Sequence, residues 1–150
     1  MPTEIENITS LLTRTFEKNA WHGPSVKETL QGITAEQAQI RIQNTHSIIE
    51  LVTHMVSWRT FVIKKLEGDE HYEVNDGRNF PAATDWLKSL ADLNESQSRL
   101  LAALRNFPLA KLFESVPHST YQYTFYTLIH GIIHHDLYHI GQIALIKKTF

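Results

Sequence analysis

The stretch YTFYTLIHGIIHHDLYHIGQIALIKK, residues 123–148, carries the clearest structural signal in the chain. Its apolar residues recur at steps of three and four, and this spacing predicts one amphipathic helix over about 123–148. On a helical wheel of 100° per residue, the inward-facing members are Leu128, Ile132, Ile143 and Ile146. A helix with such a stripe buries it against other helices, so the stretch predicts a helix-on-helix fold.

The histidines of this stretch separate into two groups on the wheel. His135 and His139 are one turn apart inside the apolar arc, whereas His130 and His134 lie on the opposite side. Two imidazoles buried in an apolar seam need partners, because an unsatisfied polar group is costly to bury. A shared metal ion satisfies both rings at this spacing, and hydrogen bonds to neighbouring protein groups are the structural alternative. The paired spacing favours a metal site.

The same apolar spacing predicts three further long helices. The first follows a capping box formed by Thr3 and Glu6, the second spans about 45–66, and the third begins near Thr84 and ends before Pro108. The core positions predicted for the third helix are Leu87, Leu90, Leu93, Leu101 and Leu104.

Shorter helical turns are predicted in the connections, after the capping pairs Ser25–Glu28 and Thr34–Gln37. No alternating strand pattern, internal repeat or linker is present. Four long amphipathic helices predict an all-α four-helix bundle, and 150 residues are enough for a single domain over 1–150.

The second long helix is expected to supply the third metal ligand. His54 borders its apolar stripe, and Glu50 precedes His54 by one turn, where it could bind the ion or accept a hydrogen bond from a ligand. Gln142 follows His139 and could orient a bound water or substrate, or could simply bond a neighbouring helix. His54, His135 and His139 are therefore the predicted metal ligands.

The remaining histidines are not expected to bind the metal, and the sequence lacks two other common metal-binding motifs. His46 is expected near a helix cap, and His22, His71 and His118 fall in predicted loops. No His-Glu-x-x-His string occurs, which excludes the helical zinc-protease motif. The repeated Glu-x-x-His pattern of di-iron bundles is also missing. Three histidines with open positions are typical of a catalytic rather than a structural site.

Composition excludes several classes of protein. The formal net charge is -2, and no basic cluster indicates a nucleic-acid partner. There is no cysteine, so thiolate ligands, disulfides and a cysteine nucleophile are all excluded. No apolar run approaches the roughly 20 residues of a membrane span. The polar, acidic start does not resemble a signal peptide, so we expect a cytoplasmic protein.

Three strings resemble the DinB-like family of four-helix-bundle metalloproteins. They are Ile133–Ile143 (IHHDLYHIGQI), His46–His54 (HSIIELVTH) and Trp21–Ser25 (WHGPS). The resemblance implies an up-down-down-up bundle, often a homodimer, with a metal on three histidines that align with His54, His135 and His139. It implies nickel or zinc as the ion, with iron or manganese as alternatives. Some relatives resemble transferases or isomerases that use a low-molecular-weight thiol.

Two functional hypotheses follow. In the first, the protein is a metal-dependent enzyme that transfers a low-molecular-weight thiol, or else hydrolyses its substrate with water activated by the metal. In the second, it is a non-catalytic dimeric metal-binding protein of the stress-response type, which a closed coordination sphere with Glu50 as fourth ligand would favour. Tryptophans are frequent interface anchors, so Trp21, Trp58 and Trp86 are candidate dimer contacts, with core packing as the alternative.

Overall fold

The computed structural model describes residues 1–150 and contains helices but no strand. The long helices are α1 (Glu4–Phe16), α4 (Ile48–Leu66), α6 (Trp86–Asn106) and α7 (Phe125–Lys147). The short elements are α2 (Val26–Leu30), α3 (Ala35–Ala38), α5 (Asp76–Asn79) and the 3-10 turn η1 (Leu109–Lys111). The predicted all-helical class and the four long helices are confirmed. The two short turns predicted after Ser25 and Thr34 are confirmed as α2 and α3.

Local hydrogen bonds decide where the helices begin. Thr3 and Glu6 form the predicted capping box of α1, and Thr124 accepts from the backbone of Thr127 at the start of α7. The helix predicted from about 45 begins instead at Ile48, because Ser47 is extended and its backbone N–H donates to Glu50 at 2.8 Å. The first turn of α4 is therefore anchored three residues later than expected.

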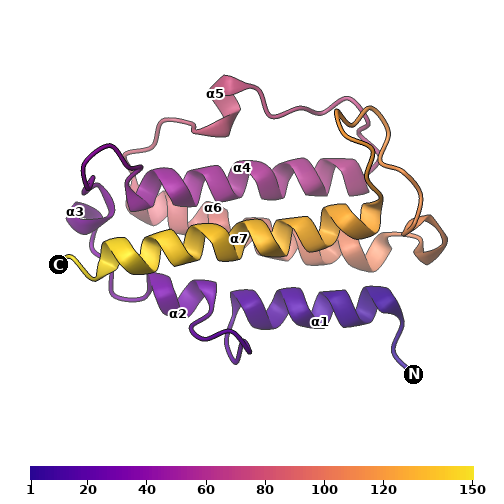
Figure 1. The fold of residues 1–150 in the computed structure, drawn as a ribbon, viewed down its shortest axis with the longest axis horizontal. Coiled ribbons are helices and arrows are strands. Elements are labelled where there is room, and N and C mark those ends of the chain that lie inside the picture. The colour runs from indigo at the N-terminus through magenta and orange to yellow at the C-terminus, as the bar shows by residue number, and fades with distance from the viewer.

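Figure 1 shows α7 in front, with α4 above it, α6 behind, and α1 and α2 end to end below. Helix α4 packs against both α6 and α7, and α7 also contacts α1 and α2. The connection from α4 to α6 carries α5 across the outer side of α4 (Figure 1). None of the helices is long and apolar enough to cross a membrane.

The core consists of two apolar clusters with polar side chains between them. One cluster contains buried apolar side chains from residues 61–63 of α4 and 125–133 of α7, and the other contains buried apolar side chains from residues 48–55 of α4 and 140–146 of α7. Buried polar side chains from three helices lie between the clusters: His54 and Arg59 of α4, Gln97 of α6, and Asp136 and His139 of α7. The bundle therefore holds a polar layer at mid-height, where burial forces each polar group to find a partner.

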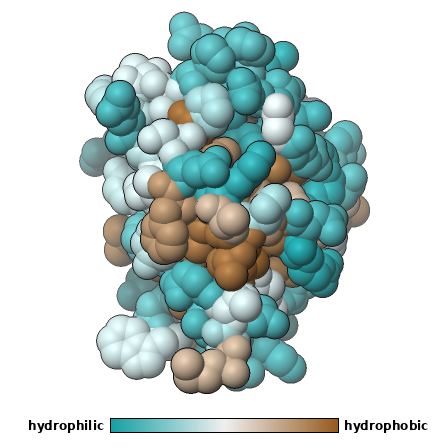
Figure 2. Space-filling view, turned by 90° about the vertical axis from the view of Figure 1, so that its right-hand side faces the viewer, coloured by the Kyte–Doolittle hydropathy of each residue, from teal (hydrophilic) through white to brown (hydrophobic).

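One predicted core position is wrong, and apolar side chains also remain at the surface. Leu87 is 77% exposed because it lies on the outer side of α6, one residue after the buried Trp86. The end of the bundle where α4 finishes and α7 begins presents an apolar patch surrounded by polar surface (Figure 2). Leu109 and Phe113, in the segment that leads to α7, are both exposed.

Candidate metal centre

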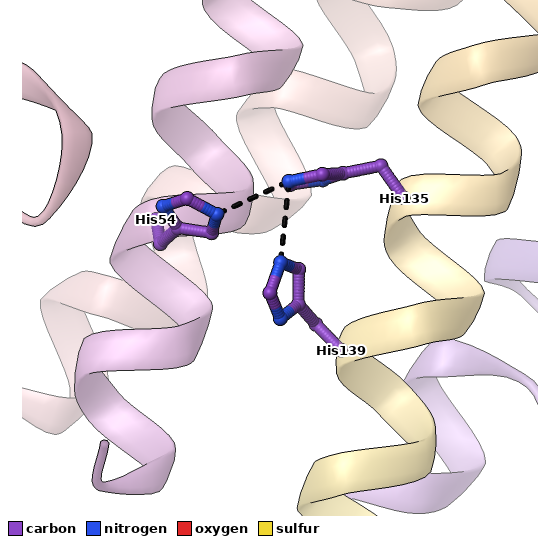
Figure 3. Close-up of side chains that lie close together, drawn as sticks. All are labelled: His54, His135 and His139. Atoms are coloured by element: carbon purple, nitrogen blue, oxygen red, sulfur yellow. Dashed lines mark hydrogen bonds between the residues drawn. The ribbon is translucent and has the colours of Figure 1, made fainter. Parts of the chain in front are cut away.

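The three predicted ligands come together between α4 and α7. His54 projects from α4 and His135 and His139 from α7, and their rings converge (Figure 3). The Nε2 atom of His135 lies 3.1 Å from that of His54 and 3.2 Å from that of His139. One ligand atom from each ring lies within 4.8 Å of the others, a grouping able to hold a metal ion.

The outer nitrogens of two rings fix which nitrogen carries the proton. His54 Nδ1 donates to the backbone oxygen of Asn79 at 2.7 Å, and His139 Nδ1 donates to Oε1 of Gln142 at 2.7 Å. A neutral imidazole has one N–H, so both Nε2 atoms are left with a free lone pair. Metal-binding histidines are oriented in this same way by a second acceptor.

These lone pairs make the cluster incomplete without a cation. A proton on His135 Nε2 can be donated to one neighbouring ring but not to both. In at least one of the two contacts, two unprotonated nitrogens therefore face each other with no hydrogen between them. Two nitrogens bound to one tetrahedral zinc ion at about 2.05 Å lie about 3.3 Å apart, close to the separations seen here. The donor set fits a divalent metal.

Burial keeps the three rings uncharged. Removal from water, together with the nearby His139, His54 and Arg59, lowers the pKa of His135 to about 3. Burial likewise lowers the pKa of His54 and of His139 below the usual histidine value. Coordination needs neutral imidazole, so the site is ready to bind a cation at neutral pH.

A connecting segment missed by the sequence analysis covers His54. Phe80 stacks on His54 at a ring separation of 4.1 Å and on His46 at 3.9 Å. Asn79 accepts from His54 through its backbone oxygen and, at 3.0 Å, from the indole N–H of Trp58 through its side chain. The end of α5 therefore orients a ligand and an aromatic neighbour together.

A buried ion pair lies in the same layer. Arg59 donates to the two carboxylate oxygens of Asp136 at 3.2 and 2.5 Å and to Gln97 at 2.8 Å. Arg59 and Asp136 are both 0% exposed. The sequence did carry a signal for them, because each falls in the apolar arc of its helix, where a charge requires a partner.

Glu50 does not join the site, contrary to one prediction. Its carboxylate accepts from the backbone N–H and hydroxyl of Ser47 and pairs with Arg41. These contacts hold it at the first turn of α4, where a carboxylate is favourable at the helix N-terminus. By contrast, Gln142 contacts the cluster, because its side-chain oxygen accepts a hydrogen bond from His139.

The other histidines remain outside the cluster. His134 is exposed on α7, and His130 bonds the backbone oxygen of Tyr126 at 2.9 Å, so the predicted division of the α7 histidines is confirmed. The rings of the exposed loop residues His71 and His118 are tilted relative to each other, with their centres 4.5 Å apart. His22 is exposed and contacts the backbone of Pro24.

A cavity opens beside one ligand. It has a volume of about 250 Å³, and His135 forms part of its wall together with Trp58 and Phe61. His135 is only half-buried, whereas His54 and His139 are buried. A small molecule in this cavity would therefore lie against the ring of His135.

Comparison with known proteins gives one match. No curated protein and no solved structure matches the chain significantly. The sequence model that describes the DinB superfamily matches residues 21–143. This range contains all three clustered histidines and most of the bundle, and on it the chain belongs to the DinB superfamily.

Proposed function

We propose that the chain binds one divalent metal ion on His54, His135 and His139 and is a metal-dependent enzyme that transfers a low-molecular-weight thiol. The observation that carries the proposal is the convergence of three imidazoles, in two of which an outer acceptor fixes the nitrogen that carries the proton. Nickel and zinc suit such a nitrogen donor set, and iron or manganese are the alternatives.

The absence of a carboxylate from the histidine cluster supports the catalytic hypothesis over the non-catalytic one. Glu50 is held by Ser47 and Arg41, and Asp136 is held by Arg59, so neither is free to act as a fourth ligand. A divalent ion with an open position supplies Lewis acidity that lowers the pKa of a thiol or a water molecule.

The chain's own residues would then bind, orient and shield. Asn79 and Gln142 hold the rings of His54 and His139 in the required tautomer. Phe80 covers His54 and separates it from solvent. Since the chain has no cysteine, a thiol nucleophile has to come from a diffusible cofactor. An up-down-down-up bundle is proposed too, because the long α4–α6 connection allows consecutive helices to run parallel.

Metal binding is tested by changing each histidine to alanine. Metal content per chain, measured by mass spectrometry after dialysis against trace metal, should fall close to zero for His54→Ala, His135→Ala and His139→Ala. His134→Ala is the matched control, because it lies beside His135 on the exposed side of α7. Equal metal loss in the control would contradict the assignment.

The reaction is tested by separating thiol transfer from hydrolysis. Electrophile consumption is measured with and without glutathione, bacillithiol or mycothiol, and the His139→Ala protein serves as the blank. Turnover that needs a thiol supports the transferase. Turnover without a thiol identifies a hydrolase, and a metal-loaded protein inactive across a broad panel is the non-catalytic dimer.

A further inference from the structure

We propose that the cavity beside His135 binds an uncharged apolar group, an aromatic ring or a short alkyl chain, of the molecule whose polar end reaches the metal centre. This inference rests on the proposed function for its link to the metal, but the cavity itself can be tested without metal. Four observations carry it: the lining, the charge, the volume and the position.

The lining is apolar and aromatic. Trp58, Phe61 and Val62 of α4 face Leu128 and Ile132 of α7 across the cavity. Trp58 and Phe61 meet edge to face with ring centres 5.4 Å apart, an arrangement that aromatic pairs favour. Such walls gain free energy when they exclude water from an apolar guest.

No charged side chain faces this cavity. Its polar members are the hydroxyls of Tyr123 and Thr127 and the ring of His135. A charged guest would lose its hydration and find no counter-ion, which is costly. The walls therefore select against both carboxylates and ammonium groups.

The volume limits the size of the guest. The cavity opens to solvent beside the exposed Gly131, and its volume of about 250 Å³ accommodates one ring or a chain of a few carbons. It is smaller than the pockets of roughly 300–1,000 Å³ that enclose drug-sized ligands. The guest is thus one substituent of a substrate rather than the whole molecule.

The position ties the guest to the metal centre. Trp58 lies 5.9 Å from the ring of His135 and 6.4 Å from that of His54, and Asn79 holds its indole in place. His135 Nδ1 is buried without a hydrogen-bond partner, so on that side its ring is held by packing alone. An apolar guest would lie against a ligand ring, with its polar end directed to the cluster.

The test uses the full-length protein, stripped of metal, and the nuclear magnetic resonance signals of its three indole N–H groups. The probes are 1-butanol, 1-pentanol and 1-hexanol, with hexanoate and hexylammonium as charged counterparts. We expect the Trp58 signal to shift and affinity to rise about fourfold per added methylene, until the chain exceeds the cavity. The signals of the exposed Trp21 and of Trp86, whose indole bonds Ile33, serve as internal controls.

Two glycines of α7 give a matched pair of variants. Gly131 lines the cavity, whereas Gly141 does not, and a Cβ built at either position meets no atom within 4 Å. Both Gly131→Leu and Gly141→Leu should fold, because leucine is the better helix former. We expect Gly131→Leu to weaken 1-hexanol binding at least tenfold and Gly141→Leu to leave it unchanged.

Three results would overturn the inference. They are equal shifts of all three indole signals, equal effects of the two leucine variants, and binding of hexanoate or hexylammonium as tight as that of 1-hexanol. Failure of the proposed function is distinguishable, because it would appear as unchanged metal content in the histidine variants while the alcohols still bind. If the protein binds metal but none of the alcohols, the inference about the cavity is rejected and the proposed metal site is not.

Discussion

Changing Asp136 to asparagine should strongly destabilise the protein. Arg59 is completely buried, and its charge is balanced by two hydrogen bonds to the Asp136 carboxylate. Gln97 and the ring of Phe16, 4.6 Å from the guanidinium, provide its other contacts and carry no charge. Asp136→Asn therefore leaves a buried cation unpaired, a change that costs about 3–5 kcal/mol.

Urea unfolding in the presence of a chelator measures this cost without a contribution from metal. For a chain of this size, about 3–5 kcal/mol corresponds to a fall in Tm of roughly 6–20 °C. The control is Asp92→Asn, the same substitution in the exposed Lys88–Asp92 pair. Exposed pairs contribute little, so this variant should unfold close to wild type.

A double variant separates the charge from the packing. Arg59→Met with Asp136→Leu removes both charges and keeps apolar volume in the layer, and such replacements are often neutral or stabilising. We expect it to recover most of the stability that Asp136→Asn loses. If Asp136→Asn unfolds at the same urea concentration as Asp92→Asn, the reasoning about the ion pair is refuted.

Three further predictions concern pH, the α5 segment and assembly. The unfolding free energy of the metal-free protein should fall as pH drops from 7 to 5.5, because burial depresses the folded pKa of His135 to about 3 while the unfolded chain takes up protons near pH 6.5. The slope is at most about 1.4 kcal/mol per pH unit for each histidine, and urea titrations of His135→Ala should show a shallower one; an unchanged slope would contradict the assignment. Asn79→Ala should retain metal, since the backbone oxygen that orients His54 remains, but should free the Trp58 indole at a cost of about 1 kcal/mol; metal content and indole exchange rates test this, and lost metal would count against it. We also predict a homodimer through the outer side of α7, where Leu145 is 68% exposed; light scattering should give twice the chain mass for wild type and a lower mass for Leu145→Glu, whereas a monomeric wild type would rule it out.

The helical fold could be predicted because its signals are local. Apolar spacing and capping boxes act within one or two turns, so the four long helices and the turns at Ser25 and Thr34 were predictable from neighbouring residues. Two local features were predicted wrongly, the start of α4 and the burial of Leu87. Ser47 captured Glu50 and moved the start of α4, and Leu87 faced solvent although its spacing suited the core.

The histidine cluster was predictable in part for the same reason. His135 and His139 share one helix face, and the wheel places both in the apolar arc. Their approach to His54 involves two helices, α4 and α7. Because the apolar side of each helix faces the same core, histidines on those sides are brought together by burial. That these three rings bind metal remains a prediction, which the variants described above test.

The surroundings of the cluster were decided by the tertiary structure alone. Asn79 and Phe80 lie in a polar connection without periodicity, yet the fold brings them onto α4, 25 residues away from His54 in the case of Asn79. The cavity beside His135 is lined by side chains of both α4 and α7, so neither helix forms it alone. The sequence by itself determined the helices and the inward-facing groups, since both depend on periodicity. Which acceptor orients His54, and which ring of the cluster borders the cavity, depend on contacts between distant segments that no local pattern encodes.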